Sequence, residues 1–368
     1  MKLNKSFRYR LKPNSEQEII INKTFGCCRF IYNKMLADKI TYYEETKESY
    51  RNTPAMYKGE FGFLKEVDSL ALANEQMNLE TAFRNFFRNT KVGFPKFKSK
   101  KHDRASYITN NINNSIRIIN TNHIKLPRLG IVKFIEHRRI PKDYIIKSVA
   151  ISRSPSGKYF ISILTEYEYD IPEKTLNVNN SLGLDYSSRD FYVDSQNKTP
   201  ENYKHLYRIS EDKLAKEQRK LSHMKLHSNN YEKQKIKIAK VHEKISNQRK
   251  EFIETLSTKL ANSYDIICIE DLNLRNIAQS LKLGKSTNDN GFGIFKTKLE
   301  QKLPLQGKKL IRIDKWFPSS KTCRFCGAIN SDLKLSDREW DCECGAHLLR
   351  DHNAAINILN EGLRVFLN

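Results

Sequence analysis

The sequence contains no run of apolar residues that approaches the ~20 needed to cross a membrane, and its first ten residues, MKLNKSFRYR, lack the apolar core of a secretory signal. Internal repeats and low-complexity tracts are absent as well. Its 39% of hydrophobic and 10% of aromatic residues are typical of a globular protein, and 368 residues are enough for two or three domains. We therefore expect a globular, cytoplasmic protein.

Acidic residues are too few to balance the basic ones. The chain has 65 Lys and Arg but 42 Asp and Glu, which gives a net charge of +23 at pH 7. Because this excess is spread along most of the chain, it predicts a polyanionic partner, with nucleic acid ahead of an acidic membrane surface.

Two segments concentrate the positive charge. Residues 204–250 carry fourteen Lys and Arg against five Asp and Glu. A solvated helix face explains any single lysine there, but the whole set on long helices suits contact with a nucleic-acid backbone. Residues 84–104 carry eight Lys and Arg, one acidic residue and four aromatic residues.

The aromatic residues in the second segment and just before it fall into two groups. Phe83, Phe86 and Phe87 keep helical spacing, which predicts that they pack in the core. Phe94 and Phe97 lie in a basic loop, where packing and stacking on a base or ribose are both open.

Cysteine is scarce, and its placement does not suit a disulfide framework. Three of the seven cysteines, Cys27, Cys28 and Cys268, lie in apolar segments and are expected to be buried thiols. The other four cluster near the end of the chain, as a metal site requires.

Those four cysteines form two close pairs, C-x-x-C and C-x-C, with fifteen residues between them: Cys323, Cys326, Cys342 and Cys344. A glycine follows each pair, as a tight turn around a metal requires. Four thiolates predict zinc, and the zinc is structural because a closed four-ligand site has no open position for a substrate. His347 is a weaker candidate for the same site.

The first half of the chain predicts a β-barrel that is interrupted by a helical subdomain. Residues 5–13 alternate in polarity like a strand, and a long helix follows, opened by a capping box of Ser15 and Glu18. A second helix is predicted over 69–87, and short strands return over 106–169.

The second half predicts an α/β sheet. Residues 170–180 are expected to form a linker, and 181–196 to form a strand, a turn and a second strand. A long basic helical region follows over 205–262, with a break near 226–232. An apolar strand ending at Glu270, a helix and a last strand come next, and this alternation is typical of an α/β sheet.

Three carboxylates stand out in this half. Each has a structural explanation: Asp351 can cap a helix, Glu270 can end a strand, and Asp185 can accept turn hydrogen bonds. However, Asp185 and Glu270 lie in runs that are otherwise apolar, and a buried carboxylate needs a cation or a partner. Oxygen ligands suit Mg²⁺ or Mn²⁺, and two such ions can activate water and stabilise the leaving 3′ oxygen of a phosphodiester. In a basic protein this predicts a nuclease.

An ordered set of motifs resembles the TnpB proteins of IS200/IS605- and IS607-type insertion sequences. The motifs of the second half are GLDYS, IEDLNL, KTCRFCG, LSDREWDCECG and RDHNAAINI. Those of the first half are RYRLKPN, RFIYNK, AFRNFF, GFPKFKSKK, IKLPRLG and GKYFISI. The resemblance covers nearly the whole chain and is highly specific. TnpB proteins are similar to the compact type V CRISPR effectors.

The resemblance implies an RNA-guided, divalent-metal-dependent DNA endonuclease of a transposable element, which uses a guide RNA from the transposon end to cleave target DNA next to a short recognition motif. It implies that Asp185, Glu270 and Asp351 are catalytic and bind Mg²⁺, with Mn²⁺ as a substitute. Arg338 matches a family arginine near the scissile phosphate, although an exposed charge on the zinc ribbon is the alternative. The partners implied are the guide RNA and double-stranded target DNA, with no membrane partner. The resemblance also implies a monomer that acts in a prokaryotic cytoplasm, at the nucleoid.

The fold implied is α+β and multidomain. Its first part is a wedge-like β-barrel, interrupted by a helical recognition subdomain: residues 1–13 and 104–170 for the barrel, 14–103 for the subdomain. Its second part is an RNase H-like (RuvC) α/β nuclease domain with an inserted zinc ribbon: residues 178–315 and 346–368 for the nuclease, 316–345 for the ribbon.

Three departures from the family pattern are visible. Leu349 stands where the family often has Asp, Ser187 where a glycine is common, and the second cysteine pair is one residue shorter. None removes a carboxylate, so we expect an active nuclease. The alternatives are a nuclease-silent RNA-guided repressor on the same scaffold and an RNase H-like transposase or resolvase that acts without RNA. A zinc-ribbon RNA-binding protein without catalysis would leave the carboxylates unexplained.

Overall fold

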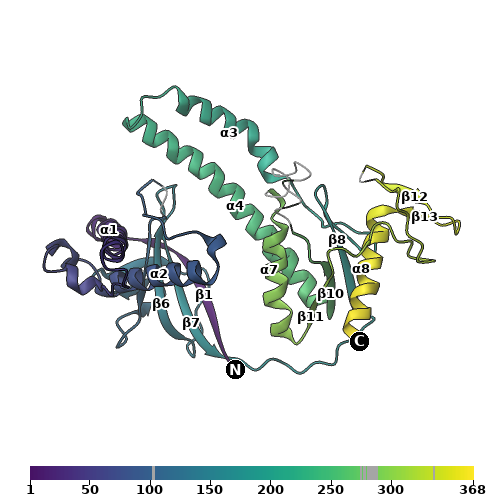
Figure 1. The fold of residues 1–368 in the computed structure, drawn as a ribbon, viewed down its shortest axis with the longest axis horizontal. Coiled ribbons are helices and arrows are strands. Elements are labelled where there is room, and N and C mark those ends of the chain that lie inside the picture. Colours follow the sequence, from purple (N-terminus) through teal and green to yellow (C-terminus); the bar gives the residue numbers. More distant parts are fainter. Residues whose placement is uncertain (102–103, 274–275, 277–278, 280–288, 335) are drawn as a thin grey trace. The chain divides into compact units, whose positions relative to one another are not determined.

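The computed structural model forms two compact units, Met1–Tyr169 and Asp170–Asn368 (Figure 1). It describes all residues except 102–103, 274–275, 277–278, 280–288 and 335. The predicted linker starts at the boundary between the units, and residues 170–177 form neither helix nor strand. Among the helices of the described residues, none combines the length and apolarity that a membrane crossing requires.

The first unit contains a seven-stranded antiparallel sheet of order β2-β6-β7-β1-β5-β4-β3. Its strands are β1 (Lys2–Lys12), β2 (Ser106–Asn110), β3 (Arg117–Asn120), β4 (His123–Leu126), β5 (Gly130–Ile135), β6 (Ile145–Arg153) and β7 (Tyr159–Glu168). In β1 the alternate residues Phe7, Tyr9 and Leu11 are buried, which confirms the strand predicted from alternating polarity. β2 and β3 are the end strands of the sheet, and closure into a barrel stays a prediction.

Two helices follow β1, as predicted, and they share one core with the sheet: α1 (Ser15–Thr46) and α2 (Ser69–Arg88). Short 3-10 helices lie between or just after them: η1 (Pro54–Tyr57), η2 (Gly62–Lys65) and η3 (Thr90–Val92). The capping box predicted at Ser15 is wrong by one residue. Asn14 accepts from the Gln17 amide at 2.8 Å, and Gln17 Oε1 accepts from the Asn14 amide at 3.1 Å, because Asn and Gln serve these positions as well as Ser and Glu. Cys27 and Cys28 are buried thiols in α1, as predicted.

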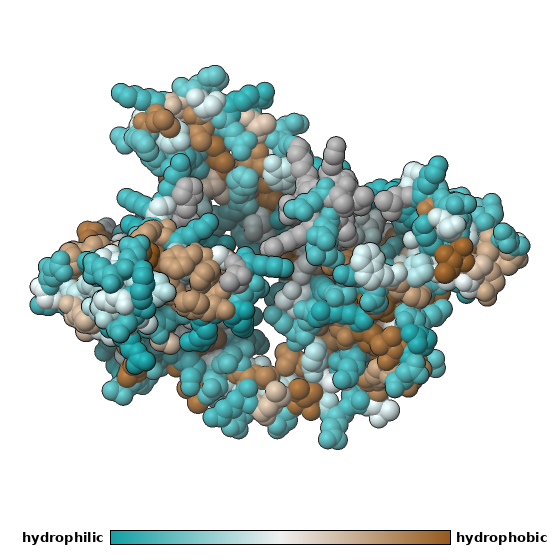
Figure 2. Space-filling model, in the orientation of Figure 1, coloured by the Kyte–Doolittle hydropathy of each residue, from teal (hydrophilic) through white to brown (hydrophobic). Residues whose placement is uncertain are grey.

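The core packing predicted for Phe87 is wrong. The buried stripe of α2 runs through Leu72, Glu75 and Leu79 and reaches Phe83, which packs against the core, whereas Phe87 lies beyond it and is 75% exposed. Figure 2 shows apolar side chains at the surface of this unit near α2.

The second unit is built on a four-stranded sheet of order β11-β10-β8-β9, in which β8, β10 and β11 are parallel and β9 is antiparallel to β8. The strands are β8 (Ser181–Ser187), β9 (Phe191–Asp194), β10 (Ile266–Glu270) and β11 (Lys309–Ile313). The helices are α3 (Leu206–Ser222), α4 (Asn229–Ser263), α7 (Phe292–Lys302) and α8 (Arg350–Leu367), with a 3-10 turn, η4 (Pro304–Gln306). A small hairpin, β12 (Glu339–Asp341) and β13 (His347–Leu349), precedes α8.

The long basic helical region is broken between α3 and α4, as predicted, and the two helices lie side by side and extend away from the sheet (Figure 1). The amide of Gln234 donates to the backbone of Glu217 at 2.9 Å and so joins them. Later in α4, Ile253 and Leu260 are buried in the core that also contains α7. Most of α3 and the first half of α4 therefore present their cations to solvent.

Helix α8 lies directly on the sheet. A Cβ atom at Gly183 in β8 would come within 2.2 Å of the Ala355 carbonyl oxygen, and one at Gly362 in α8 within 2.4 Å of Cys268 Sγ. Only glycine permits this close approach of helix and strands. Cys268 is buried, as predicted, and α8 packs against β8, β10 and β11.

Candidate active site and cysteine cluster

Asp185 and Glu270 lie on neighbouring parallel strands. Leu184 of β8 pairs with Ile269 of β10, so the two acids occupy the next opposed positions of the ladder. Both side chains are partly buried. This arrangement puts two carboxylates near the carboxyl ends of two strands, the edge at which α/β sheets commonly carry their sites.

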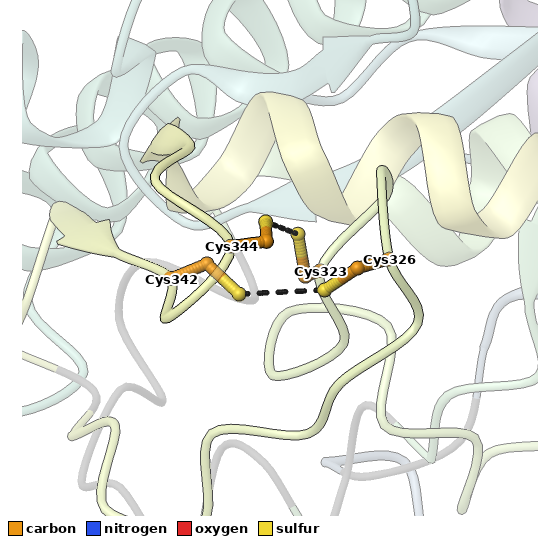
Figure 3. Close-up of side chains that lie close together, drawn as sticks. All are labelled: Cys323, Cys326, Cys342 and Cys344. Atoms are coloured by element: carbon orange, nitrogen blue, oxygen red, sulfur yellow. Dashed lines mark hydrogen bonds between the residues drawn. The ribbon is translucent and has the colours of Figure 1, made fainter.

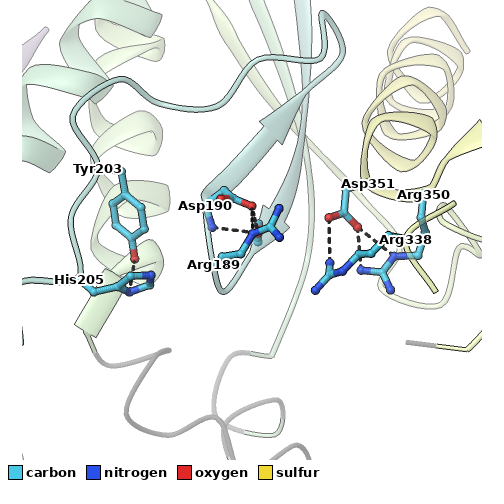
Figure 4. A network of polar contacts seen from close by, with 8 residues as sticks. Arg189, Asp190, Tyr203, His205, Arg338, Arg350 and Asp351 are labelled. Atoms are coloured by element: carbon cyan, nitrogen blue, oxygen red, sulfur yellow. Dashed lines mark hydrogen bonds and ion pairs between the residues drawn. The ribbon is translucent and has the colours of Figure 1, made fainter. Parts of the chain in front are cut away.

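Asp351 lies in the first turn of α8 and does not cap it. The cap position is Leu349, and no side-chain hydrogen bond caps the helix there, so the explanation of Asp351 as an N-cap is wrong. The carboxylate of Asp351 instead accepts hydrogen bonds from Arg350 Nη2 at 2.7 Å and Arg338 Nη1 at 3.3 Å. Figure 4 shows both guanidinium groups directed at Asp351. Arg338 is thus both half-exposed and bonded to a predicted catalytic acid.

The three acids interact electrostatically. Burial raises the pKa of Asp185 well above its usual range, the charges of Glu270 and then Asp351 raise it further, and Arg350 opposes them. Burial also raises the pKa of Glu270, and a hydrogen bond from Ser319 partly offsets that effect. Buried anions that repel one another in this way form a site that a bound cation would stabilise.

The carboxylates do not gather as tightly as ligands of one ion. Within the described part of the chain, the four cysteines are the one cluster of three or more His, Cys, Asp or Glu side chains that is compact enough to hold a metal ion. The oxygen donors of these acids are of the kind that hard cations such as Mg²⁺ prefer.

The four cysteine sulfurs form a compact cluster (Figure 3). The Sγ atoms of Cys323 and Cys344 are 3.8 Å apart and those of Cys326 and Cys342 are 3.5 Å apart, and all four lie within 4.8 Å of one another. A tetrahedron with Zn–S bonds of ~2.3 Å has sulfurs ~3.8 Å apart, whereas a disulfide needs ~2.05 Å. The cluster therefore fits a structural zinc site.

The turns around the cluster need glycine. Gly327 and Gly345 have φ angles of 77° and 88°, and Gly345 donates to the carbonyl of Cys342 at 2.8 Å. The shortened second pair therefore still closes its turn. His347 lies outside the cluster, with Nδ1 2.7 Å from a carboxylate oxygen of Asp341.

Three polar residues that the sequence patterns did not single out connect the cysteine cluster with the predicted catalytic acids. Asn353 and Asn357 of α8 are buried, and both donate to the carbonyl of Thr322, at 2.7 and 2.6 Å, just before the first cysteine. Ser319 donates to a carboxylate oxygen of Glu270. Two asparagines four residues apart in an apolar helix share one face. This spacing is the feature of the sequence from which a shared buried contact could have been predicted.

Three family models match separate parts of the chain. The IS605-type OrfB model, described as "Probable transposase", matches residues 162–281, a helix-turn-helix model of the same family matches 1–48, and a Cas12f1-like TNB domain model matches 292–358. In the structure, residues 1–48 form strand β1 and the single helix α1.

Two relatives are similar over almost their full length. A Streptomyces pristinaespiralis protein, provisionally named an RNA-guided DNA endonuclease, is 34% identical over 98% of this chain and 90% of its own. The Escherichia coli K12 protein InsQ, with the same provisional name, is 27% identical over 98% of this chain and 93% of its own.

The fold is also similar to a solved one. The protein chain in the cryo-EM structure of a Cas12f1–sgRNA–target DNA complex superposes with a TM-score of 0.62 at 14% identity, over 98% of this chain and 99% of that one. The chain thus has a Cas12f-like α+β fold with a cysteine cluster near its C-terminus. From the family models and the two full-length relatives, we conclude that the chain belongs to the TnpB family of IS605-type OrfB proteins.

Proposed function

We propose that this chain is an RNA-guided, divalent-metal-dependent DNA endonuclease of a transposable element, which cleaves target DNA next to a short recognition motif. The observation that carries the proposal is the parallel register that sets Asp185 opposite Glu270, with Asp351 close enough for its charge to raise the pKa of Asp185. A binding protein has no need of a partly buried acid whose pKa two further acids raise.

In this proposal Asp185, Glu270 and Asp351 hold Mg²⁺ ions at the sheet edge. Such ions activate water and stabilise the leaving 3′ oxygen when they are bound. Arg338 is suited to contact the scissile phosphate, because its guanidinium group is half-exposed and already lies beside Asp351.

The cysteine cluster would hold a structural zinc ion. Its role would be to fold residues 316–345, which pack around a core of only a few side chains, among them Trp340 and, just beyond this segment, Leu348. Since Asn353 and Asn357 bind the backbone before Cys323, the zinc turn and the start of α8 would be ordered together.

Two surfaces are suited to nucleic acid. The first is the exposed part of α3 and α4, where exposed cations include Lys213, Lys216, Lys233 and Lys237. The second is the end of α2, where the exposed Phe87 packs beside Phe83 and Phe86, with basic residues around it. Phe94 contacts the rings of Phe83 and Phe86 edge-on and is 45% exposed, and Phe97 is 57% exposed. The rings of Phe94 and Phe97 are therefore accessible to stack on a base.

We propose the guide RNA and the double-stranded DNA target as partners, because the family implies both and the names of its members mention RNA and DNA. A protein with generic positive charge can delegate sequence recognition to base pairing. We propose that the monomer divides as predicted from the sequence: 1–13 and 104–170 wedge-like barrel, 14–103 recognition subdomain, 178–315 and 346–368 nuclease domain, 316–345 zinc ribbon.

Purification of the intact protein with its bound nucleic acid tests this proposal. We expect the protein to retain, at high salt, an RNA of about one hundred to a few hundred nucleotides. Sequencing should assign this RNA to the transposon end. Strand joining by RNA-free protein would instead favour a transposase. An RNA-bound protein that pairs with its target but never cuts would favour a repressor.

A further inference from the structure

Ser319 lies in the loop that leads from β11 to the first cysteine pair, and its side chain contacts Glu270. The hydroxyl donates a hydrogen bond to Oε1 of Glu270. An ionised carboxylate only accepts, so the direction of this bond is fixed while Glu270 is charged. Ser319 is buried, with 6% of its surface exposed, so little water competes for the bond.

The same loop is held from its other side by α8. Asn357 Nδ2 donates to the carbonyl of Ser319 at 2.8 Å and to that of Thr322 at 2.6 Å. Asn357 is itself buried, and it belongs to the helix whose first turn contains Asp351. Ser319 therefore joins the strand of one predicted metal ligand, through its hydroxyl, to the helix of another, through its carbonyl.

We infer that Ser319 is a positioning residue for the carboxylate of Glu270. The inference rests on the proposed function, since it takes Glu270 to bind metal. The hydrogen bond holds one carboxylate oxygen and leaves the other for a cation, so the rotation of the group is set before metal binds. Without the hydroxyl, Glu270 is free to rotate, and metal binding must order it.

The test compares Ser319→Ala with Ser320→Ala, which removes a hydroxyl from the next residue of the same loop. Mn²⁺ binding to each purified protein is measured by electron paramagnetic resonance, without chelators that would remove zinc. We expect Ser319→Ala to bind Mn²⁺ about tenfold more weakly and Ser320→Ala to bind it normally. The Mg²⁺ concentration for half-maximal cleavage should rise similarly, while the rate at saturating Mg²⁺ stays close to that of the unchanged protein.

A purely structural role for Ser319 predicts a different result, namely a lower Tm with unchanged Mn²⁺ affinity. That result in a folded Ser319→Ala protein would overturn the inference. If Ser319→Ala does not fold, Ser319→Cys is measured in the same way, because it keeps the size of the side chain and weakens the donor.

Glu270→Gln separates this inference from the proposed function. If the unchanged protein cuts no DNA, but Mn²⁺ binding is weakened in both Glu270→Gln and Ser319→Ala, the positioning role is supported and the nuclease is contradicted. Normal Mn²⁺ binding in Glu270→Gln, or none in the unchanged protein, would contradict both.

Discussion

Leu184 and Ile269 are paired in parallel register, and this single pairing determines which acids meet. A shift of one residue would turn Glu270 to the other face of the sheet, away from Asp185. The close packing of α8 on Gly183 then keeps Asp351 near the same edge. The candidate site is thus a consequence of strand register and of one glycine contact.

Asp185→Asn should stabilise the metal-free protein. The pKa of Asp185 is raised in the folded state, so its ionisation costs stability as the pH rises from the unfolded value of ~3.9 through the folded value. Near pH 8 the substitution removes that cost, and we expect a Tm higher by a few degrees without Mg²⁺ and a smaller gain on adding Mg²⁺.

Asp271→Asn is the matched control for this measurement. Asp271 adjoins Glu270 but forms an ion pair with Lys296, which holds the pKa of Asp271 below its usual range. Its neutralisation should leave Tm unchanged or lower it. An equal rise in Tm for both variants, measured in chelator-free buffer, would show that general charge reduction is responsible.

Asp351→Asn should fold and bind nucleic acid but cleave at least about a hundredfold more slowly, because Asn cannot replace a charged metal ligand. Cleavage is measured on target duplex with Mg²⁺, and binding in parallel with Ca²⁺. Glu361→Gln, which changes an acid that is paired with Arg364 on the same helix, is the control and should cleave normally. Substantial cutting by Asp351→Asn would remove Asp351 from the active site.

Cys326→Ser should destabilise the second unit, because three thiolates bind zinc weakly and the small core around Trp340 cannot hold the ribbon alone. Elemental analysis should give about one zinc per unchanged chain and much less in the variant. Phe325→Ala, which alters an exposed neighbour and keeps all four thiolates, should retain the metal. A metal-free chain that is fully folded would contradict the zinc site.

Replacing Lys213, Lys216, Lys233 and Lys237 with Gln should weaken nucleic-acid binding. The slope of log affinity against log salt should flatten by about 0.7–0.9 for each phosphate that the variant no longer neutralises. Replacing Lys220 and Lys235 should have less effect, because Glu217 and Glu232 already oppose their charges. An unchanged slope in the fourfold variant would show that this part of α3 and α4 does not contact nucleic acid.

Local patterns predicted the strands, the helices and the cysteine turns well, because alternation, spacing and glycine act over a few residues. They misjudged details that depend on distant contacts. Asp351 is no helix cap because α8 begins one residue before it, and two arginines bind its carboxylate instead. Phe87 is exposed because the buried stripe of α2 ends before it. The link from Ser319 to Glu270 spans 49 residues, and no local pattern predicts such a contact.

The most direct test of the central claim is guided cleavage with a matched pair of RNAs. The protein is assembled with two RNAs that differ only in the segment that pairs with DNA, and each complex is given both matching duplexes with Mg²⁺. We predict that each complex cuts only the duplex that matches its RNA, and that Asp185→Ala complexes bind the same duplex without cutting it. Cleavage that ignores the RNA, or that persists in Asp185→Ala, would contradict the account.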